Sequence, residues 1–352
     1  MSAKRRKRAT SPDTLEDNWT RLLIGDCRKR LAEIKSGSVQ CCVTSPPYWG
    51  LRDYKATGQV GLERTTDAYV EALVEVFREV RRCLRRDGTL WLNLGDAYAG
   101  SYGAHSRQKT TEANDARSTL EGSSRKAARQ IADAPEISTS ATKAGTGLRQ
   151  KNLLGLPWRV AFALQASGWV LRSEIIWEKA NAHPESVTDR PTKAHEHVFL
   201  FSKQRHYFYD STAIAEPALV GHRGSFAPTS GTRPRVDHEM RNARSVWSIA
   251  TEPNHFHCTA MMPRKLAERC VLAGSSHGSL VLDPFAGAGT TLLVARELGR
   301  HGVGIELNRE SAADAWERTR QCPLFGDLPQ GSFEAAAEQS ALASQSQLPN
   351  AP

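Results

Sequence analysis

The stretch Val281-Leu282-Asp283-Pro284-Phe285-Ala286-Gly287-Ala288-Gly289-Thr290-Thr291 decides the fold of this chain. A short apolar run leads into a glycine turn, and a helical pattern follows the turn as far as Leu298. Glycines in such a turn let backbone N–H groups approach a ligand, because no Cβ atom stands in the way. The turn lacks the third glycine of a dinucleotide-binding fingerprint, and no Gly-Lys-Ser/Thr follows it, so the NAD-binding and P-loop interpretations both lose support. The pattern therefore predicts a ligand-binding turn between a buried strand and a helix.

Glu306 follows the next apolar run, residues 302–305, and so stands at the tip of the strand that this run predicts. A carboxylate in this position can accept hydrogen bonds from both hydroxyls of a ribose. The alternative is an acid that only faces solvent at the end of a strand. We favour the ribose acceptor, because the glycine turn lies so close in sequence.

Strands and helices alternate along most of the chain. Apolar runs typical of strands occupy residues 22–24, 39–44, 89–94, 170–177, 197–201, 279–282 and 302–305. Helical spacing of apolar residues covers 27–35, 69–84, 158–166 and 265–273, and continues in the helices that end at 298 and 321. Asp87-Gly88 is expected to turn the chain into the strand at 89–94. This alternation predicts an α/β fold with an open, largely parallel sheet.

A second motif, Ser45-Pro46-Pro47-Tyr48, closes the strand at 39–44. It resembles motif IV of amino-methyltransferases, whose general form is [DNS]-P-P-[YFW]. An exocyclic amine is a poor nucleophile because its lone pair is delocalised into the ring, and a side-chain oxygen together with a backbone carbonyl can accept its two hydrogens. The prolines fix the backbone that carries this carbonyl, and the aromatic ring can stack on a base that has left the duplex. For Pro-Pro-aromatic alone, a surface turn or a polyproline stretch is the alternative.

The two motifs and their order resemble the β group of DNA amino-methyltransferases, in which the catalytic half precedes the cofactor half. The resemblance covers roughly residues 20–325 and includes Trp49-Gly50-Leu51-Arg52-Asp53-Tyr54 and the stretch 189–197. It implies an S-adenosylmethionine-dependent enzyme that methylates an exocyclic amino group at a specific site in double-stranded DNA, after the base is flipped out. It also implies a Rossmann-like methyltransferase sheet with permuted motif order and an inserted target recognition region. Protein and RNA amino-methyltransferases ordinarily carry the glycine turn first, so the order favours DNA.

Ser45 in the first position of its motif favours cytosine N4 as the target, since Ser-Pro-Pro-Tyr is usual in the enzymes that methylate this atom. Adenine N6 is the alternative, because the correlation has exceptions. A cytosine C5 enzyme would need a Pro-Cys nucleophile, and no cysteine here follows a proline. A more remote alternative is a non-catalytic DNA-binding protein that retains the cofactor fold.

The resemblance also assigns roles to single residues. Asp26 corresponds to the acid that accepts from the cofactor adenine, although it could equally be a helix N-cap. The segment 257–266 resembles a helix that packs beside the methionine part of the cofactor. The expected catalytic residues are Ser45, Pro46, Pro47 and Tyr48. The expected cofactor-binding residues are Asp26, Cys27, Ala260, Pro263, Asp283, Phe285, Gly287, Gly289, Thr290 and Glu306.

Composition suggests where these functions lie along the chain. Stretches that are basic without periodicity, or that have few large apolar side chains, predict a disordered basic tail, a mobile loop and a second disordered tail. These are residues 1–19, 100–152 and 327–352. The catalytic half is expected at 20–99 and 153–205, the target recognition region at 206–250 and the cofactor-binding half at 251–326.

Basic and aromatic side chains are frequent in residues 206–250. Arginines there can bond guanine edges bidentately, but they can equally bind phosphates. The DNA-binding candidates are Arg223, Arg233, Arg235, Arg241 and Arg244.

The formal net charge of +9 suits a polyanionic partner such as double-stranded DNA. No apolar run approaches the ~20 residues of a membrane helix, and residues 1–8 lack the apolar stretch of a signal peptide, so a cytoplasmic protein without a membrane partner is expected. The seven cysteines are odd in number and form no Cys-x-x-Cys pair, which disfavours a disulfide framework and a structural metal site. We expect a monomer or a homodimer, and leave open whether a cognate restriction endonuclease accompanies it.

Overall fold

The computed structural model describes residues 13–51, 56–100, 146–218, 240–253, 261–321 and 338. Within these ranges a 9-stranded sheet has the order β1-β2-β11-β10-β3-β4-β6-β5-β9. The bounds of its strands, in that order, are Thr14–Glu16, Thr20–Ile24, His301–Glu306, Leu280–Asp283, Val39–Thr44, Leu84–Leu94, His195–Ser202, Val170–Glu178 and Val246–Ser248. A second, two-stranded sheet pairs β7 (Glu216–Pro217) with β8 (Met240–Arg241).

The large sheet is mostly parallel. Among its described strands, β1 runs against β2 and β6 runs against both β4 and β5, while all other neighbours are parallel. Strands β2, β11, β10, β3, β4 and β5 therefore end at one edge of the sheet, and β6 begins there. This confirms the largely parallel α/β sheet predicted from the alternation, and in such sheets ligands bind at the carboxyl edge.

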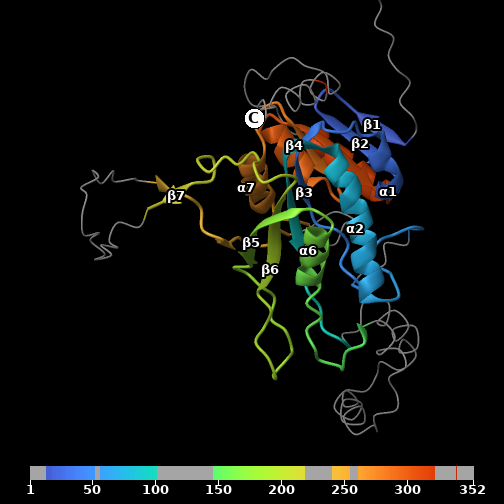
Figure 1. The fold of residues 1–352 in the computed structure, drawn as a ribbon, viewed down its shortest axis with the longest axis vertical. Coiled ribbons are helices and arrows are strands. Elements are labelled where there is room, and N and C mark those ends of the chain that lie inside the picture. The colour runs from blue at the N-terminus through green and yellow to red at the C-terminus, as the bar shows by residue number, and fades with distance from the viewer. Residues whose placement is uncertain are drawn as a thin grey trace, which may run out of the picture.

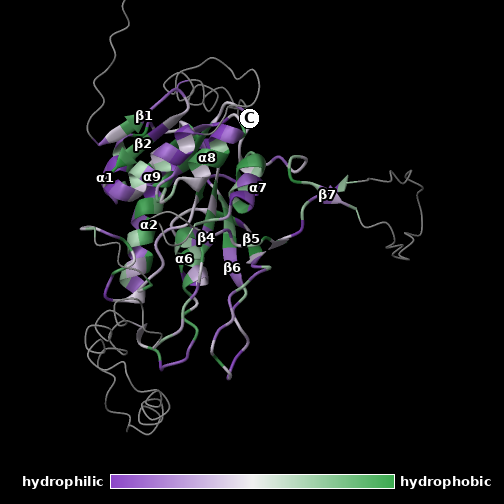
Figure 2. Cartoon of the chain, turned by 180° about the vertical axis from the view of Figure 1, so that it is seen from behind, coloured by the Kyte–Doolittle hydropathy of each residue, from purple (hydrophilic) through white to green (hydrophobic). Residues whose placement is uncertain are grey.

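Helices cover both faces of the sheet (Figure 1). Helices α2 (Thr66–Cys83) and α6 (Leu156–Ala166) lie on one face, and α7 (Arg264–Gly274) and α8 (Thr290–Glu297) lie on the other. Successive residues of β4 serve opposite faces, since Leu90 and Leu92 join the core under α2 and α6 whereas Trp91 joins the core under α7. Figure 2 shows hydrophobic colour along the central strands and both colours on the helices, as expected for a sheet buried by amphipathic helices.

Two helices pack near the start of the sheet order. Helix α1 (Cys27–Arg30) follows β2 and continues as a 3-10 turn, Leu31–Glu33, so the helix predicted at 27–35 is shorter and tighter than expected. Helix α9 (Arg309–Arg320) packs on α8 and β2. Within the described ranges, no helix combines the length and the apolarity that crossing a membrane requires.

The predicted disordered tail at 1–19 is wrong for its last residues. Residues 14–16 form β1, which pairs with β2, and Asp17 forms an ion pair with Arg296 at 2.5 Å. The buried Trp19 ring stacks on His301 with ring centroids 4.6 Å apart. A strand of three residues is too short to show an alternating pattern. Contacts between side chains far apart in sequence fix the chain directly after β1. Residues 1–12 lie outside the described residues.

Strand β4 begins at Leu84, whereas the sequence predicted a turn at Asp87-Gly88 and a strand from 89. The pairing of β4 with β3 shifts register between Val39 and Cys41, which accommodates the extra residues as an irregularity inside the strand. A glycine in a strand is typical of such a position.

The proposed recognition region, 206–250, is not irregular throughout. Residues 246–248 form β9, an edge strand of the large sheet, and Trp247 is buried against Trp91 with ring centroids 6.2 Å apart. The end of this region is therefore part of the core. The β7–β8 pair projects from the body of the molecule (Figure 1). Residues 219–239, most of the predicted loop at 100–152 and most of the predicted tail at 327–352 lie outside the described residues.

Candidate active site

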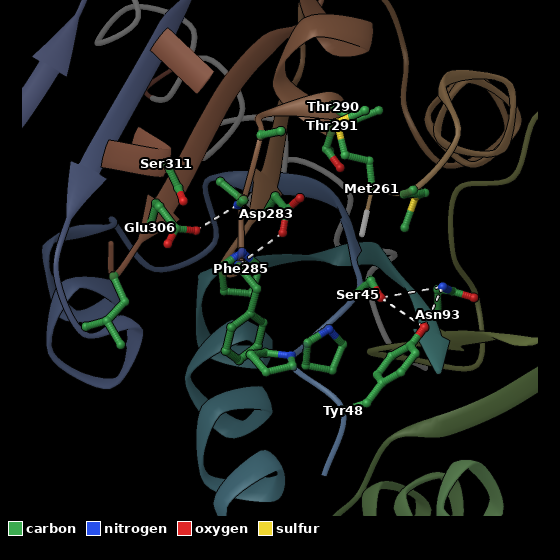
Figure 3. Close-up of a pocket in the computed structure, with 18 of the residues that line it drawn as sticks. Ser45, Tyr48, Asn93, Met261, Asp283, Phe285, Thr290, Thr291, Glu306 and Ser311 are labelled. Atoms are coloured by element: carbon green, nitrogen blue, oxygen red, sulfur yellow. Dashed lines mark hydrogen bonds between the residues drawn. The ribbon is translucent and has the colours of Figure 1, made fainter. Parts of the chain in front are cut away.

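Five polar side chains form a row along the carboxyl edge of the sheet. Asp26 follows β2, Glu306 ends β11, Asp283 ends β10, Ser45 follows β3, and Asn93 lies at the end of β4. These strands are neighbours in that order, so residues from distant parts of the chain come together. All five side chains line one pocket of about 470 Å³. Figure 3 labels Glu306, Asp283, Ser45 and Asn93 in this pocket.

The half of the pocket that the sequence assigns to the cofactor contains Glu306. Its Oε2 accepts from the Gly287 N–H and its Oε1 from the Asn308 N–H, each at 2.8 Å. Burial raises the pKa of Glu306, and these backbone donors only partly offset that effect. The carboxylate thus joins the glycine turn to the end of β11, and each of its oxygens keeps a lone pair for a ligand hydroxyl.

Asp283 joins the two sequence motifs. Its Oδ1 accepts from the Thr44 hydroxyl at 2.6 Å, across 239 residues of sequence, and from the Phe285 N–H at 3.1 Å. Burial raises the pKa of Asp283 to about 6, against the lowering effect of these hydrogen bonds. A buried carboxylate with a raised pKa in a cleft is a feature of functional sites.

Asp26 performs the capping role that was the alternative for it. It is the N-cap of α1, where its Oδ1 accepts from the Arg28 N–H at 3.0 Å, and it also forms an ion pair with the Arg28 guanidinium at 2.7 Å. Burial acts to raise the pKa of Asp26, but the Arg28 bonds outweigh it and the pKa is lowered. Next to it, burial and the Asp26 charge raise the pKa of Cys27 to about 12, so this residue lines the pocket as a neutral thiol.

Some expected cofactor residues lie elsewhere. Gly289 caps α8 with φ 74°, and a Cβ there would meet the Cβ of Ala315 at 2.9 Å, so close packing against α9 requires this glycine. Neither Gly289 nor Pro263, the N-cap of α7, is among the pocket-lining residues. Ala260 lies outside the described residues.

Three other expected residues do line the pocket: Phe285, Gly287 and Thr290. Met261 and Met262, which belong to the segment 257–266 that was expected beside the cofactor, line it as well. Thr290 has a partner that the sequence did not suggest. Arg318 of α9 donates to the Thr290 hydroxyl at 2.9 Å and to the Ala288 carbonyl at 3.1 Å.

The catalytic half of the pocket contains a hydrogen-bond network around Tyr48 (Figure 3). The Tyr48 hydroxyl donates to Glu196 Oε2 at 2.6 Å and lies 3.3 Å from the Ser45 hydroxyl. The Asn93 amide donates to the Tyr48 oxygen at 3.0 Å and to Glu196 Oε2 at 2.8 Å. Lys179 donates to Glu196 Oε1 at 2.6 Å. Burial, and then the charge of Glu196, raise the pKa of Tyr48 well above its usual range, so its hydroxyl stays protonated.

The backbone of the Ser45-Pro46-Pro47-Tyr48 motif is held from several sides. The Tyr69 hydroxyl of α2 donates to the Pro47 carbonyl at 2.9 Å, and the Trp49 indole donates to the Glu63 carbonyl at 2.8 Å. The Tyr48 ring lies against Gly95, where a Cβ would meet the ring at 2.5 Å. The motif is thus anchored before any substrate binds.

Three residues of this network were not expected from the sequence: Asn93, Lys179 and Glu196. Glu196 does lie in the stretch 189–197 that matched the family pattern, which was the signal available for it. Asn93 ends a predicted strand, as Ser45 follows one. Lys179 reaches the pocket only because β5 ends where the reversed strand β6 begins, with Glu178 opposite His195.

The arginines expected to contact DNA are only partly within the described residues. Arg241 and Arg244 both bond Glu216, at 3.0 Å and 2.6 Å, and so hold the base of the β7–β8 pair. Arg223, Arg233 and Arg235 lie outside the described residues.

The N6/N4 family model, described as DNA methylase, matches residues 39–317. This chain belongs to the DNA methylase family. The type II methyltransferase M.SmaI of Serratia marcescens is 45% identical over 311 residues, which are 87% of this chain and 93% of that protein. M.Cfr9I of Citrobacter freundii, also a type II methyltransferase, is 42% identical over 299 residues, which are 85% of this chain and 87% of that protein.

Solved structures agree in fold. A protein described as a DNA modification methylase from Thermus thermophilus, complexed with S-adenosyl-L-methionine, has a TM-score of 0.53 at 25% identity, and the match covers 86% of this chain and 95% of that one. The PvuII DNA methyltransferase has a TM-score of 0.57 at 17% identity over 94% of both chains, which shows the fold alone. The predicted family and methyl donor are confirmed: the DNA methylase is an S-adenosylmethionine-dependent type II DNA methyltransferase.

Proposed function

We propose that this DNA methylase transfers the methyl group to N4 of a cytosine that has been flipped out of duplex DNA. The observation that carries the proposal is the state of the Ser45 hydroxyl. The Tyr48 hydroxyl uses its hydrogen on Glu196, so its oxygen can only accept from its other neighbours, Asn93 and Ser45. Ser45 therefore donates its hydrogen to Tyr48, and since its oxygen also accepts from the Asn93 amide at 3.4 Å, one lone pair is left for the pocket.

An acceptor at Ser45 suits an exocyclic amine, which offers two hydrogens. We assign the second hydrogen to the Pro46 carbonyl, because the neighbouring Pro47 carbonyl already accepts from Tyr69. Accepting both hydrogens draws the nitrogen towards a tetrahedral geometry and makes its lone pair available. S-Adenosylmethionine supplies an electrophilic methyl group when it is bound.

Lys179 favours cytosine over adenine. Next to their amino groups, cytosine presents the acceptors N3 and O2, whereas adenine presents N1 and then a C–H. The Lys179 ammonium has three hydrogens, and its described hydrogen bond, to Glu196, uses one of them. The remaining donors line the same pocket as Ser45 and suit the two acceptors of a cytosine.

The cofactor half of the pocket fits S-adenosylmethionine. We propose that Glu306 accepts from the ribose hydroxyls, that Asp26 and Cys27 lie at the adenine, and that Asp283 faces the positively charged methionine end. Phe285, Gly287 and Thr290 also line the pocket. An anionic wall suits a cofactor that carries a sulfonium and an ammonium, and it leaves the catalytic half for the base.

We infer that the target base is flipped out, because the acceptor residues lie inside the pocket. Ser45 and Asn93 lie at the sheet edge inside the pocket, and an enzyme cannot reach an amine there while the base is stacked in a duplex. The partly buried Tyr48 ring, backed by Gly95, offers a fixed surface for the extruded base.

Analysis of the methylated nucleoside tests the proposal. Plasmid DNA treated with the enzyme and labelled cofactor is digested to nucleosides and separated, and the label is expected in N4-methyldeoxycytidine. Label in N6-methyldeoxyadenosine would overturn the cytosine assignment. Ser45→Ala is the matched variant, and it should lower transfer by about 100-fold while cofactor affinity stays unchanged.

A further inference from the structure

Glu196 is an uncommon carboxylate for a DNA pocket, because it carries negative charge towards a polyanionic substrate. Its side chain is only 13% exposed, and it accepts from three different side chains: Tyr48, Asn93 and Lys179. Its Oε2 takes the Tyr48 and Asn93 bonds and its Oε1 takes the Lys179 bond. Protein groups thus use both lone pairs of Oε2 and one of Oε1, and one lone pair of Oε1 remains.

A carboxylate in this position determines the direction of every hydrogen bond in the network. An ionised carboxylate only accepts, so Tyr48 must donate to it, and the Tyr48 oxygen must then accept from Ser45. A hydroxyl partner or an amide in its place would leave Tyr48 free to donate to Ser45 instead. Ser45 could then point its own hydrogen at the amine, which would block the acceptor role.

We propose that Glu196 is a positioning residue that keeps Ser45 an acceptor, and that Lys179 holds the Glu196 carboxylate in place. The proposal rests on the proposed function, in which Ser45 accepts a hydrogen of the target amine. It holds for an amine on cytosine or on adenine. Lys179 has a second task here, since its charge balances that of Glu196 beside the DNA.

The sheet explains why this pair can be placed so accurately. Glu196 is in β6 and Lys179 follows β5, and these strands pair in register from Glu178 opposite His195. Strand β6 also pairs with β4, where His197 lies opposite Leu94, beside Asn93. Lys179 is further held over the Trp177 ring at 5.1 Å. Glu196 and Asn93 therefore lie in paired strands, and Lys179 directly follows one, which favours a fixed geometry of the network.

Glu196→Gln is the direct test, because the amide keeps the shape of the side chain but can donate. We expect kcat to fall by about 10- to 100-fold, with KM for S-adenosylmethionine and Kd for the DNA within about threefold of wild type. Glu174→Gln is the matched control, since Glu174 is also a strand carboxylate with one close partner, His197, and is not among the pocket-lining residues. It should retain wild-type kcat.

A double-mutant cycle separates positioning from general structural support. Tyr48→Phe removes the hydroxyl through which Glu196 acts on Ser45, so Glu196→Gln should cause little further loss in that background. Full, additive losses in the double variant would overturn the proposal, as would wild-type kcat in Glu196→Gln. If Glu196→Gln does not fold, Tyr48→Phe alone must show the same loss of kcat with unchanged KM.

The two proposals fail differently. An active Ser45→Ala variant would remove the acceptor role itself and with it the proposed function. If Ser45→Ala is inactive and Glu196→Gln is fully active, the acceptor role of Ser45 stands and the positioning role of Glu196 is wrong.

Discussion

Gly95 shows how one missing side chain shapes the active site. A Cβ at this position would lie 2.5 Å from Cε2 of Tyr48, well inside the contact distance of two carbon atoms. Gly95→Ala must therefore displace the Tyr48 ring and, with it, the bond to Glu196. We expect kcat to fall at least about 10-fold, while the affinity for the cofactor, which we place in the other half of the pocket, stays unchanged. Steady-state kinetics with a calorimetric titration of S-adenosylmethionine would check this, and an unchanged kcat would show that the ring position is unimportant.

Asp283 reduces the stability of the protein at neutral pH. Burial raises its pKa from the ordinary value of 3.8 to about 6, so the folded state binds a proton that the unfolded state has already released. Stability should therefore fall as pH rises from about 4 to 6, and the loss persists above that range. We predict that Asp283→Asn raises the free energy of unfolding at pH 7.5 by about 2–3 kcal/mol, as measured by urea titration. The difference from wild type should be much smaller at pH 4. An equal difference between variant and wild type at pH 4 and pH 7.5 would contradict this prediction. Keeping a carboxylate that destabilises the fold is consistent with a ligand-binding role.

At the scale of elements, the short strand β1 depends on Asp17. Its Oδ1 accepts from the Trp19 and Thr20 N–H groups at 2.8 Å each, and its Oδ2 pairs with the buried Arg296. Asp17→Ala leaves the Arg296 charge without this partner, and we expect the free energy of unfolding to fall by about 2–4 kcal/mol in a urea titration. Glu16→Ala is the control, because its pair with Arg21 is more exposed and should contribute less than about 1 kcal/mol. Equal effects of the two changes would show that burial of the Asp17 pair does not matter.

The helices and strands were largely predictable because most have a clear apolar period. Helix α2 and strands β3, β10 and β11 fall close to their predicted ranges, since their apolar faces are continuous. The exceptions have physical reasons. Strand β1 is polar and depends on Asp17, and β9 contributes one buried residue, Trp247, so neither carries a pattern. Strand β4 contains Asp87-Gly88, which local preference assigns to a turn and sheet pairing keeps in the strand.

At the scale of the whole molecule, the site could be predicted in part because each expected acid or hydroxyl ends a recognisable strand. Asp26, Ser45, Asp283 and Glu306 are of this kind, and all of them line the pocket. Lys179 and Glu196 could not be assigned in the same way, since their position depends on which strand is reversed and which strands are neighbours. Gly289 stays a predicted cofactor residue, and it also packs closely against Ala315, a contact that no local pattern reveals. Motifs at strand ends thus predict where the site lies, but the residues that neighbouring and reversed strands add to it can be assigned only from the sheet topology.

We expect recognition of the DNA sequence to lie outside the sheet. The carboxyl edge accommodates a cofactor and a base, but it offers little that could reach several base pairs in a groove, so we place sequence recognition between β7 and β8. The sequence predicts recognition by residues 206–250, yet Trp247 and β9 lie in the core. Glu216 bonds Arg241 and Arg244 at the base of the β7–β8 pair. The segment to exchange is therefore 218–239, which includes Arg223, Arg233 and Arg235.

Exchanging 218–239 for the corresponding segment of a family member with a different site should transfer the recognised sequence and leave the methylated atom unchanged. Sequencing of modified DNA from expressing cells reports both at once. The control is exchange of the whole of 206–250, which should lower the midpoint of thermal unfolding, because it replaces Trp247 and its packing against Trp91. An active 218–239 chimera that still methylates the original sequence would place recognition elsewhere. A chimera that methylates a new sequence at a different atom would mean that this segment also helps to select the base, so that the pocket alone does not determine which atom is methylated.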